Sequence, residues 1–145
     1  MGIRVGIIGP RRSRAGTGPY VARFLKDCGC EVFEWTKAEA SSFLTCLGCL
    51  PAVDAVAICS PAETHFAYIS AALERGTHVF CEKPLVWPRD HTSVELRRLI
   101  ADLALAVETV RGRVVLHENT QWPYTLDEYH RMTGEFDPND IREFS

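Results

Sequence analysis

Hydrophobic positions along the chain alternate between two patterns. Short runs rich in Val, Ile and other apolar residues recur between longer segments in which apolar residues return every three or four positions. A continuous apolar run is typical of a strand covered on both faces, and the longer spacing is typical of an amphipathic helix. The repeated order of strand, helix and strand therefore predicts βαβ units around a parallel sheet.

The pattern places each element between turn residues. The predicted strands are residues 4–8, 31–35, 54–59, 77–81 and 114–117. The predicted helices are residues 19–28, 38–47 and 63–75, then an amphipathic segment that carries Val94, Leu96, Leu99, Ile100 and Leu103. These elements predict the α/β class, with a Rossmann-like, doubly wound parallel sheet in three layers.

Turn residues and caps support these boundaries. Pro19 suits the first position of a helix, where its missing N–H has no partner to lose. The glycines expected just after helix ends are Gly29, Gly76 and Gly112. Near the C-terminus, residues 125–128 form a capping box that predicts a last helix.

Composition and charge narrow the function classes. The chain has 145 residues, 46% hydrophobic and 24% charged, which indicates one folded domain. A formal net charge of −3 gives no overall field for a phosphate backbone, so nucleic acid is not an expected partner. The chain has neither a secretory pattern at its N-terminus nor an apolar run near the roughly 18 to 20 residues of a membrane span, so we expect a cytoplasmic protein.

Six cysteines leave three interpretations to weigh. They are enough for three disulfides, and Cys28-Gly-Cys30 and Cys46-Leu-Gly-Cys49 resemble halves of a zinc site. A chain with its own core and no export signal favours reduced thiols. Cys59 and Cys81 also fall within predicted apolar strands, so we predict no metal site.

A glycine-rich loop follows the first predicted strand and leads into a helix. A phosphate needs backbone N–H groups that it can approach closely, and a helix N-terminus adds partial positive charge. The predicted cofactor-binding residues of this loop are Gly9, Pro10, Arg11, Arg12, Gly16, Thr17 and Gly18. Six residues separate Gly9 from Gly16, so the compact G-x-G-x-x-G fingerprint is not met, and a glycine-rich turn without a ligand is the alternative.

The end of the second predicted strand bears on the choice of cofactor. An acidic residue there usually receives the ribose hydroxyls of NAD, whereas this chain has Thr36-Lys37. A hydroxyl and an ammonium can bind a 2′-phosphate, which favours NADP over NAD. Glu34 is a possible contrary contact.

A second polar cluster follows the third and fourth predicted strands. Ser60-Pro61 comes directly after the third strand and His65 follows it shortly, while Glu82-Lys83-Pro84 comes directly after the fourth. The carboxyl ends of parallel strands meet at one edge of a sheet, where open α/β sheets bind their ligands.

In this order and spacing, the chain resembles the glucose-fructose oxidoreductase, inositol dehydrogenase and MocA family of NAD(P)-dependent oxidoreductases over about residues 3–123. The resemblance implies that Lys83 lies beside the nicotinamide as the catalytic residue, and that Pro84 forms a cis bond. An ammonium there can polarise a carbonyl or assist proton transfer during hydride exchange. The further cofactor-binding residues implied by the resemblance are Ser60, Pro61, His65, Glu82, Pro84 and Asn119.

His65 and two further positions have interpretations other than ligand binding. His65 fits either a place near the dinucleotide or an exposed position in the cap of a helix. His78 is expected to be a packed or edge histidine of a strand rather than a ligand. The family often ends its nucleotide domain in Arg-Phe, and Gln121 replaces that arginine, so we expect Trp122 to pack between elements.

The resemblance also implies a division of the chain into two parts. Residues 1–123 are the expected dinucleotide-binding domain, and residues 124–145 an expected helix and tail where a second, substrate-binding domain would begin. The chain is then a fragment, a naturally short relative or one part of a two-chain enzyme, and a sugar or polyol substrate is bound only with a further domain or chain.

Two functions follow from these expectations. One is the cofactor domain of an oxidoreductase, incomplete as an enzyme alone. The alternative is a non-catalytic nucleotide-binding or protein-interaction module. In either case surface left bare by an absent domain makes a homo-oligomer possible.

Overall fold

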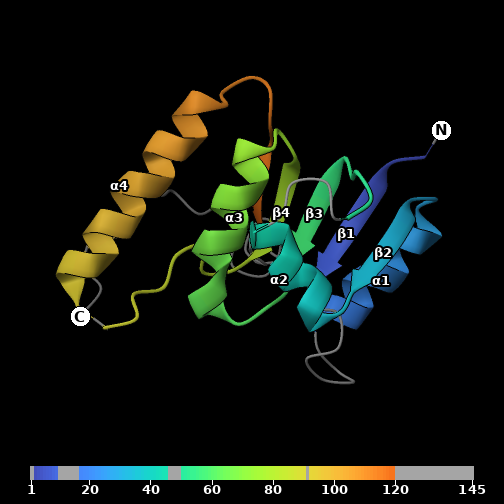
Figure 1. Cartoon of the computed structure of the whole chain (residues 1–145), viewed down its shortest axis with the longest axis horizontal. Helices are drawn as coiled ribbons and strands as arrows, with labels where there is room; N and C mark the ends of the chain where they lie inside the picture. Colours follow the sequence, from blue (N-terminus) through green and yellow to red (C-terminus); the bar gives the residue numbers. More distant parts are fainter. Residues whose placement is uncertain (1, 10–16, 46–49, 91, 120–145) are drawn as a thin grey trace, which may run out of the picture.

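The sheet is parallel throughout in the computed structural model, which describes residues 2–9, 17–45, 50–90 and 92–119. The strands are β1 (Arg4–Ile8), β2 (Glu31–Trp35), β3 (Ala55–Ile58), β4 (His78–Glu82) and β5 (Leu116–Asn119). They lie side by side in the order β2-β1-β3-β4-β5 (Figure 1). This arrangement confirms the predicted α/β class and the βαβ connections.

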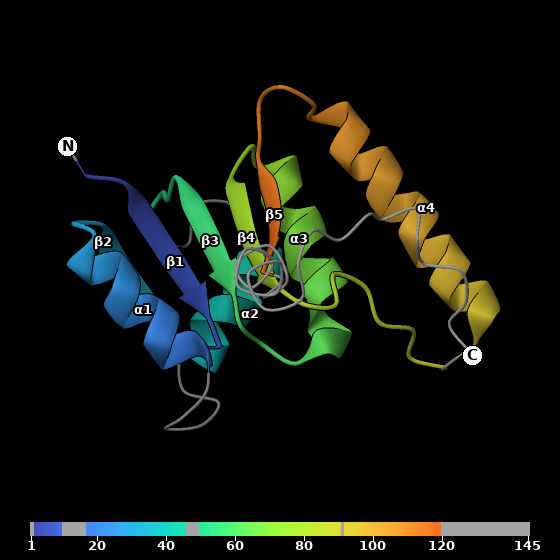
Figure 2. The same ribbon diagram turned by 180° about the vertical axis from the view of Figure 1, so that it is seen from behind.

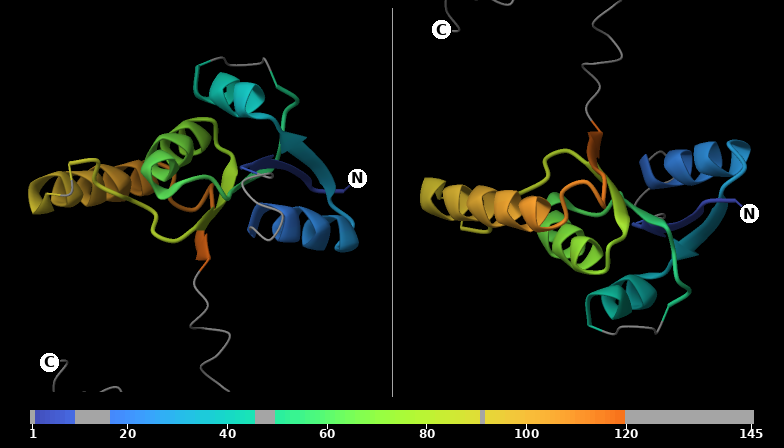
Figure 3. Two further views of the ribbon diagram at one scale, coloured as in Figure 1. Left: turned by 90° about the horizontal axis from the view of Figure 1, so that it is seen from below. Right: turned by 90° about the horizontal axis from the view of Figure 1, so that it is seen from above.

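The helices cover both faces of the sheet. They are α1 (Thr17–Asp27), α2 (Lys37–Thr45), α3 (His65–Glu74), preceded by the 3₁₀ turn η1 (Ala62–Thr64), and α4 (Ser93–Thr109). Seen along the sheet edge, α1 lies on one face, α2 and α3 lie on the other, and α4 lies beside α3 (Figure 3). The predicted three layers are therefore present.

Two apolar clusters, one on each face, hold these layers together. Val5, Ile7 and Ala57 point from the strands to α1, where they meet Val21 and Ala22. On the other face, the strand residues Ile8, Val56, Ile58 and Cys81 pack with Ile69 and Leu73 of α3 and other side chains. The central strands are apolar at nearly every position because both of their faces are covered.

Several boundaries differ from the sequence prediction. The structure begins β3 after Asp54 and ends it before Cys59, and it moves β4 and β5 toward the C-terminus, so that Glu82 and Asn119 are their last residues. Helix α1 begins at Thr17, so the prediction of Pro19 as the first helical residue was wrong. Proline fits there as the third residue, because the first turn of a helix has no intrahelical partners for its N–H groups.

Helix α4 differs most from its predicted burial. Leu99 is 7% exposed, whereas Val94 is 72% and Ile100 51% exposed. The helix contacts α3 along one stripe only and lies beside it rather than over the sheet (Figure 1). Its predicted apolar face is thus only partly buried among the described residues.

One part of the sheet is left open. No helix of the described residues lies over β4 and β5 on the face that α1 covers (Figure 2). Phe80 there stacks on the exposed ring of His117, with centroids 5.5 Å apart. Within the described part of the chain, no helix has the length and apolar character needed to cross a membrane.

Candidate functional site

The strand order creates a switch point between β1 and β3. From β1 the chain crosses over α1 to β2 on one side, and from β3 it crosses over α3 to β4 on the other. The connections diverge at the carboxyl ends of these two strands, which is where open α/β sheets bind ligands. The predicted binding residues should therefore be sought at this edge.

Gly9 marks the close approach of β1 to β3 at this edge. Its φ is 86°, and a Cβ on it would stand 2.7 Å from the carbonyl oxygen of Cys59 and 2.8 Å from the backbone nitrogen of Ser60. Only glycine satisfies both the backbone conformation and the contact. The first predicted loop residue thus has a structural reason to be glycine.

The other end of the predicted loop is the start of α1. Thr17 is the first residue of the helix and Gly18 is buried behind it. A helix that follows β1 directly presents its free N–H groups at the carboxyl edge of the sheet. The predicted residues Pro10, Arg11, Arg12 and Gly16 lie outside the described residues.

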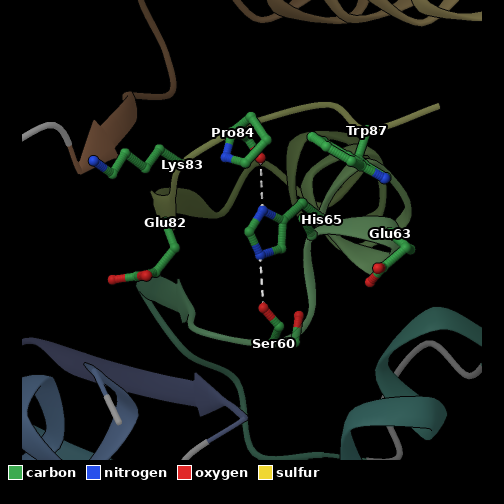
Figure 4. A pocket seen from close by; sticks show the side chains of 8 residues that line it. Ser60, Glu63, His65, Glu82, Lys83, Pro84 and Trp87 are labelled. Carbon is green, nitrogen blue, oxygen red and sulfur yellow. Dashed lines mark hydrogen bonds between the residues drawn. The ribbon is translucent and has the colours of Figure 1, made fainter. Parts of the chain in front are cut away.

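The ends of β3 and β4 enclose a cavity of about 200 Å³. Figure 4 shows the side chains around it. The structure brings these predicted residues together in its lining: Ser60, His65, Glu82, Lys83 and Pro84. Pro61, the remaining predicted residue of this cluster, is exposed and is not part of the lining.

Glu82 and Asn119 meet across neighbouring strands. They are partners in the register of β4 and β5, and the amide Nδ2 of Asn119 donates a hydrogen bond of 3.2 Å to Oε1 of Glu82. Lys83 follows as an exposed residue, and its peptide bond to Pro84 is cis, as the resemblance implied. The last polar groups of β4 and β5 therefore stand at one end of the cavity.

His65 is buried, with only 1% of its surface exposed. Its Nδ1 lies 2.8 Å from the carbonyl oxygen of Pro84, and its Nε2 lies 2.8 Å from that of Ser60. The alternative of an exposed capping histidine is wrong, because the ring is enclosed between the two strand ends. His78 is exposed on β4 and accepts a hydrogen bond from the Val115 N–H through Nδ1, as an edge histidine.

The end of β2 holds a capping box that sequence reasoning missed. The backbone N–H of Thr36 donates to Oε2 of Glu39 at 2.6 Å, and the N–H of Glu39 donates to Oγ1 of Thr36 at 3.3 Å. Hydrogen bonding from the backbone N–H and from the side-chain hydroxyl of Thr36 lowers the pKa of the Glu39 carboxyl group. Lys37 is exposed beside them, and Glu34 is paired with Lys26 at 2.6 Å.

Comparison with known proteins agrees with this geometry. Residues 5–107 match the model of an oxidoreductase family with an NAD-binding Rossmann fold, the glucose-fructose oxidoreductase, inositol dehydrogenase and MocA family. The chain belongs to this family. The resemblance drawn from Ser60-Pro61 and Glu82-Lys83-Pro84 is thus confirmed, and the folded unit is an NAD-binding Rossmann domain of the oxidoreductase type.

Individual relatives match part of their own length. The chain is 36% identical over 78 residues to inositol 2-dehydrogenase of Rhodococcus erythropolis, which is 52% of this chain and 22% of that protein. Two solved structures share the fold. One is the WlbA (WbpB) dehydrogenase of Thermus thermophilus in complex with NAD and UDP-GlcNAcA, with 22% identity and a TM-score of 0.59 over 93% of this chain and 48% of that chain. The other is the UDP-N-acetylglucosamine 3-dehydrogenase GnnA of Acidithiobacillus ferrooxidans, with 24% identity and a TM-score of 0.59 over 95% of this chain and 44% of that chain. The chain therefore spans less than half the length of these relatives.

Two polar or aromatic side chains of the lining were not predicted. Glu63 of η1 and Trp87 line the cavity with the predicted residues. Neither belongs to a motif, and their place depends on how the segments after β3 and β4 fold back. The capping box at Thr36 had a local signal, since Thr-x-x-Glu before a helix is a recognised pattern.

The cysteines in the described residues are free. Cys28, Cys30, Cys59 and Cys81 form no disulfide, and Cys46 and Cys49 lie outside the described residues. Within that same part of the chain, no group of three or more His, Cys, Asp or Glu side chains is placed to hold a metal ion.

Burial should make Cys59 unreactive in the folded protein. Burial, and secondarily the Glu82 carboxylate, raise the pKa of the Cys59 thiol to about 12, while Cys28 is exposed. The thiolate is the reactive form, so a maleimide near pH 8 is expected to label Cys28 and to spare Cys59 until denaturant is added. Mass mapping of labelled peptides measures this, and native labelling of Cys59 at the rate of Cys28 would contradict it.

Proposed function

We propose that this domain binds a nicotinamide dinucleotide across the carboxyl ends of β1, β3 and β4 and serves hydride transfer between the cofactor and a polyol or sugar. The observation that carries the proposal is that Gly9 lies against Ser60 at the switch point of the sheet, and that Ser60 lines a cavity with Lys83 from the end of the neighbouring strand β4. The NAD-binding family of the chain supports the cofactor. The substrate class is supported by the inositol dehydrogenase relative.

The residues present suit each part of the cofactor. The N-terminus of α1 offers N–H groups to the pyrophosphate, and Gly9 lets the end of β1 approach Ser60 closely beside it. The cavity between Ser60 and Glu82 offers a carboxylate, an ammonium and backbone groups to the nicotinamide end. When bound, the cofactor accepts or supplies the hydride.

Lys83 is the group that we assign to proton transfer. Its ammonium hydrogen-bonds the carbonyl oxygen of a ketone and donates a proton to it as the hydride reaches the carbon. In the reverse direction its neutral amine accepts the hydroxyl proton of the alcohol as the hydride leaves. Asn119 holds the neighbouring Glu82 carboxylate at 3.2 Å, which keeps that charge at a fixed place beside the lysine.

Titration of the full chain with NADH and NADPH, followed by nicotinamide fluorescence, tests the proposal. Enhanced and blue-shifted emission with saturable binding is the expected result. The absence of binding of either cofactor at high micromolar concentration would overturn it. Displacement of the bound reduced cofactor by NAD⁺ or NADP⁺ separates a specific site from adsorption.

We further propose that NADP is preferred. Lys37 is the exposed first residue of α2, at the strand end that receives the adenosine ribose in this fold. The Glu39 carboxylate stands close by, but it already accepts a hydrogen bond from the backbone N–H of Thr36 in the cap. Glu34, whose carboxylate could instead favour NAD, is paired with Lys26.

Substitution of Lys37 measures this preference. Lys37→Ala is expected to weaken NADPH binding about 3- to 10-fold, because a charge-assisted contact with the 2′-phosphate is lost at an exposed position. NADH binding should change less than about twofold. Lys26→Met, which removes an exposed lysine already paired with Glu34, is the control. Equal losses for NADH and NADPH in Lys37→Ala would contradict the preference.

A further inference from the structure

His65 stands between two backbone carbonyls from different parts of the chain. Ser60 follows β3 and Pro84 belongs to the turn after β4, and each carbonyl oxygen lies 2.8 Å from one ring nitrogen. Figure 4 shows the ring between these two contacts. The histidine thus joins the ends of neighbouring strands through its two nitrogens.

The protonation state of the ring decides whether both contacts are hydrogen bonds. A backbone carbonyl oxygen only accepts, and a neutral imidazole carries a proton on only one nitrogen. The neutral ring therefore makes one hydrogen bond and sets a lone pair against the other carbonyl oxygen. The imidazolium donates to both oxygens.

His78 provides a comparison within the same sheet. Its Nδ1 accepts from the backbone N–H of Val115 at 3.0 Å, so that nitrogen carries no proton. His78 is exposed, whereas His65 is enclosed and has an acceptor at each nitrogen. Nδ1 of His78 is therefore fixed as an acceptor, whereas both nitrogens of His65 face only acceptors.

The surroundings of His65 contain charges of both signs. Glu63 and Glu82 carry carboxylates into the cavity lining and Lys83 carries an ammonium, so a cationic ring faces no excess of positive charge. The enclosing segments also carry the thiols of Cys59, just after β3, and Cys81 of β4, and the phenol of Tyr68 one turn along α3. His78 and Glu74 lie at the far ends of β4 and α3.

We propose that His65 is a positioning residue that donates one hydrogen bond to Ser60 and one to Pro84, and in its doubly protonated form holds the turn that carries Lys83. Loss of a ring proton as the pH rises removes one of the two bonds and loosens the turn. The consequence for hydride transfer rests on the proposed function. The consequence for the turn does not.

Nitrogen-15 NMR of the full chain reads the ring directly. At about pH 6, both ring nitrogens of His65 are expected to show the shift of protonated nitrogen with a directly bound proton, whereas Nδ1 of His78 is expected to show the shift of an acceptor. His65→Gln and His78→Gln variants assign the signals by their disappearance. A bare nitrogen in the His65 ring at this pH would overturn the proposal.

Hydrogen exchange tests the positioning role. Glutamine donates from a single nitrogen, so His65→Gln should speed amide exchange in residues 83–86 about 2- to 10-fold at about pH 6, as expected for one lost hydrogen bond. The difference between the variant and the unchanged chain should shrink as the pH is raised to the point where the ring of the unchanged chain loses a proton, because one of its two hydrogen bonds is then lost. His117→Gln, at an exposed ring on β5, is the control.

The outcomes separate this inference from the proposed function. Equal exchange of residues 83–86 in His65→Gln and the unchanged chain would overturn the positioning role, and so would a difference that does not depend on pH. If the variant does not fold, the ring spectrum of the unchanged chain still decides. None of these measurements uses a cofactor, so failure of NADH and NADPH to bind would overturn the proposed function alone.

Discussion

Gly9→Ala is expected to lower the free energy of unfolding by about 3 kcal/mol or more. The backbone at Gly9 has φ of 86°, a conformation that alanine adopts only with strain. The added methyl group would also meet the Cys59 carbonyl oxygen at 2.7 Å and the Ser60 nitrogen at 2.8 Å, and these are backbone atoms that move only if β3 moves. Denaturant unfolding followed by circular dichroism measures the change.

Gly29→Ala is the matched control for Gly9→Ala. Gly29 has φ of 81°, nearly the same conformation, but a Cβ there would meet nothing within 4 Å. Its expected cost is the conformational strain alone, about 1 kcal/mol. Equal destabilisation by the two variants would contradict the close contact between the ends of β1 and β3.

The layers of the fold could be predicted because the signal was redundant. Residues such as Val56 and Ile58 are apolar in sequence and are fully buried between two helical layers. The continuous apolar run in the sequence therefore predicted a strand that is covered on both faces. The helix-ending glycines were equally clear, since Gly29, Gly76 and Gly112 all have positive φ. Strand ends were less accurate because hydrogen bonding to a neighbour, rather than local composition, defines them.

Burial of helices could not be predicted in the same way. The apolar period of α4 suggested a face on the core, yet Val94 and Ile100 are exposed. Periodicity gives the width of an apolar stripe but not the partner that covers it. Here α4 packs on α3 instead of on the sheet.

The candidate site was predictable where topology alone determined it. Ser60 and Lys83 both follow buried parallel strands, so their meeting at one edge required only the alternation of strands and helices. The role of His65 was not predictable, because it depends on carbonyls 5 and 19 residues away that meet only in the folded chain. The Thr36–Glu39 cap was predictable from the local Thr-x-x-Glu pattern before a helix.

Lys83→Met is expected to lower the rate of hydride transfer to a polyol or ketone substrate about 10²- to 10⁴-fold, the usual contribution of a positioned acid or base. Methionine keeps the length of the apolar stem and removes the proton donor. Because Lys83 is exposed at the mouth of the cavity, the fold should be unchanged, and the affinity for the cofactor should change by no more than about twofold. Nicotinamide absorbance measures the rate, at saturating cofactor and with the further domain or chain that binds the substrate present.

Lys26→Met tests whether the loss belongs to the position or to the charge. Lys26 is also an exposed lysine, but it lies on α1 and is paired with Glu34 of β2. Its replacement should therefore leave the rate unchanged. A bell-shaped or sigmoidal pH profile that is present with Lys83 and absent in Lys83→Met would identify the lysine as the group that exchanges the proton. A rate in Lys83→Met within threefold of the unchanged chain would instead leave Lys83 as a residue of the turn, and the proton would have to come from another group.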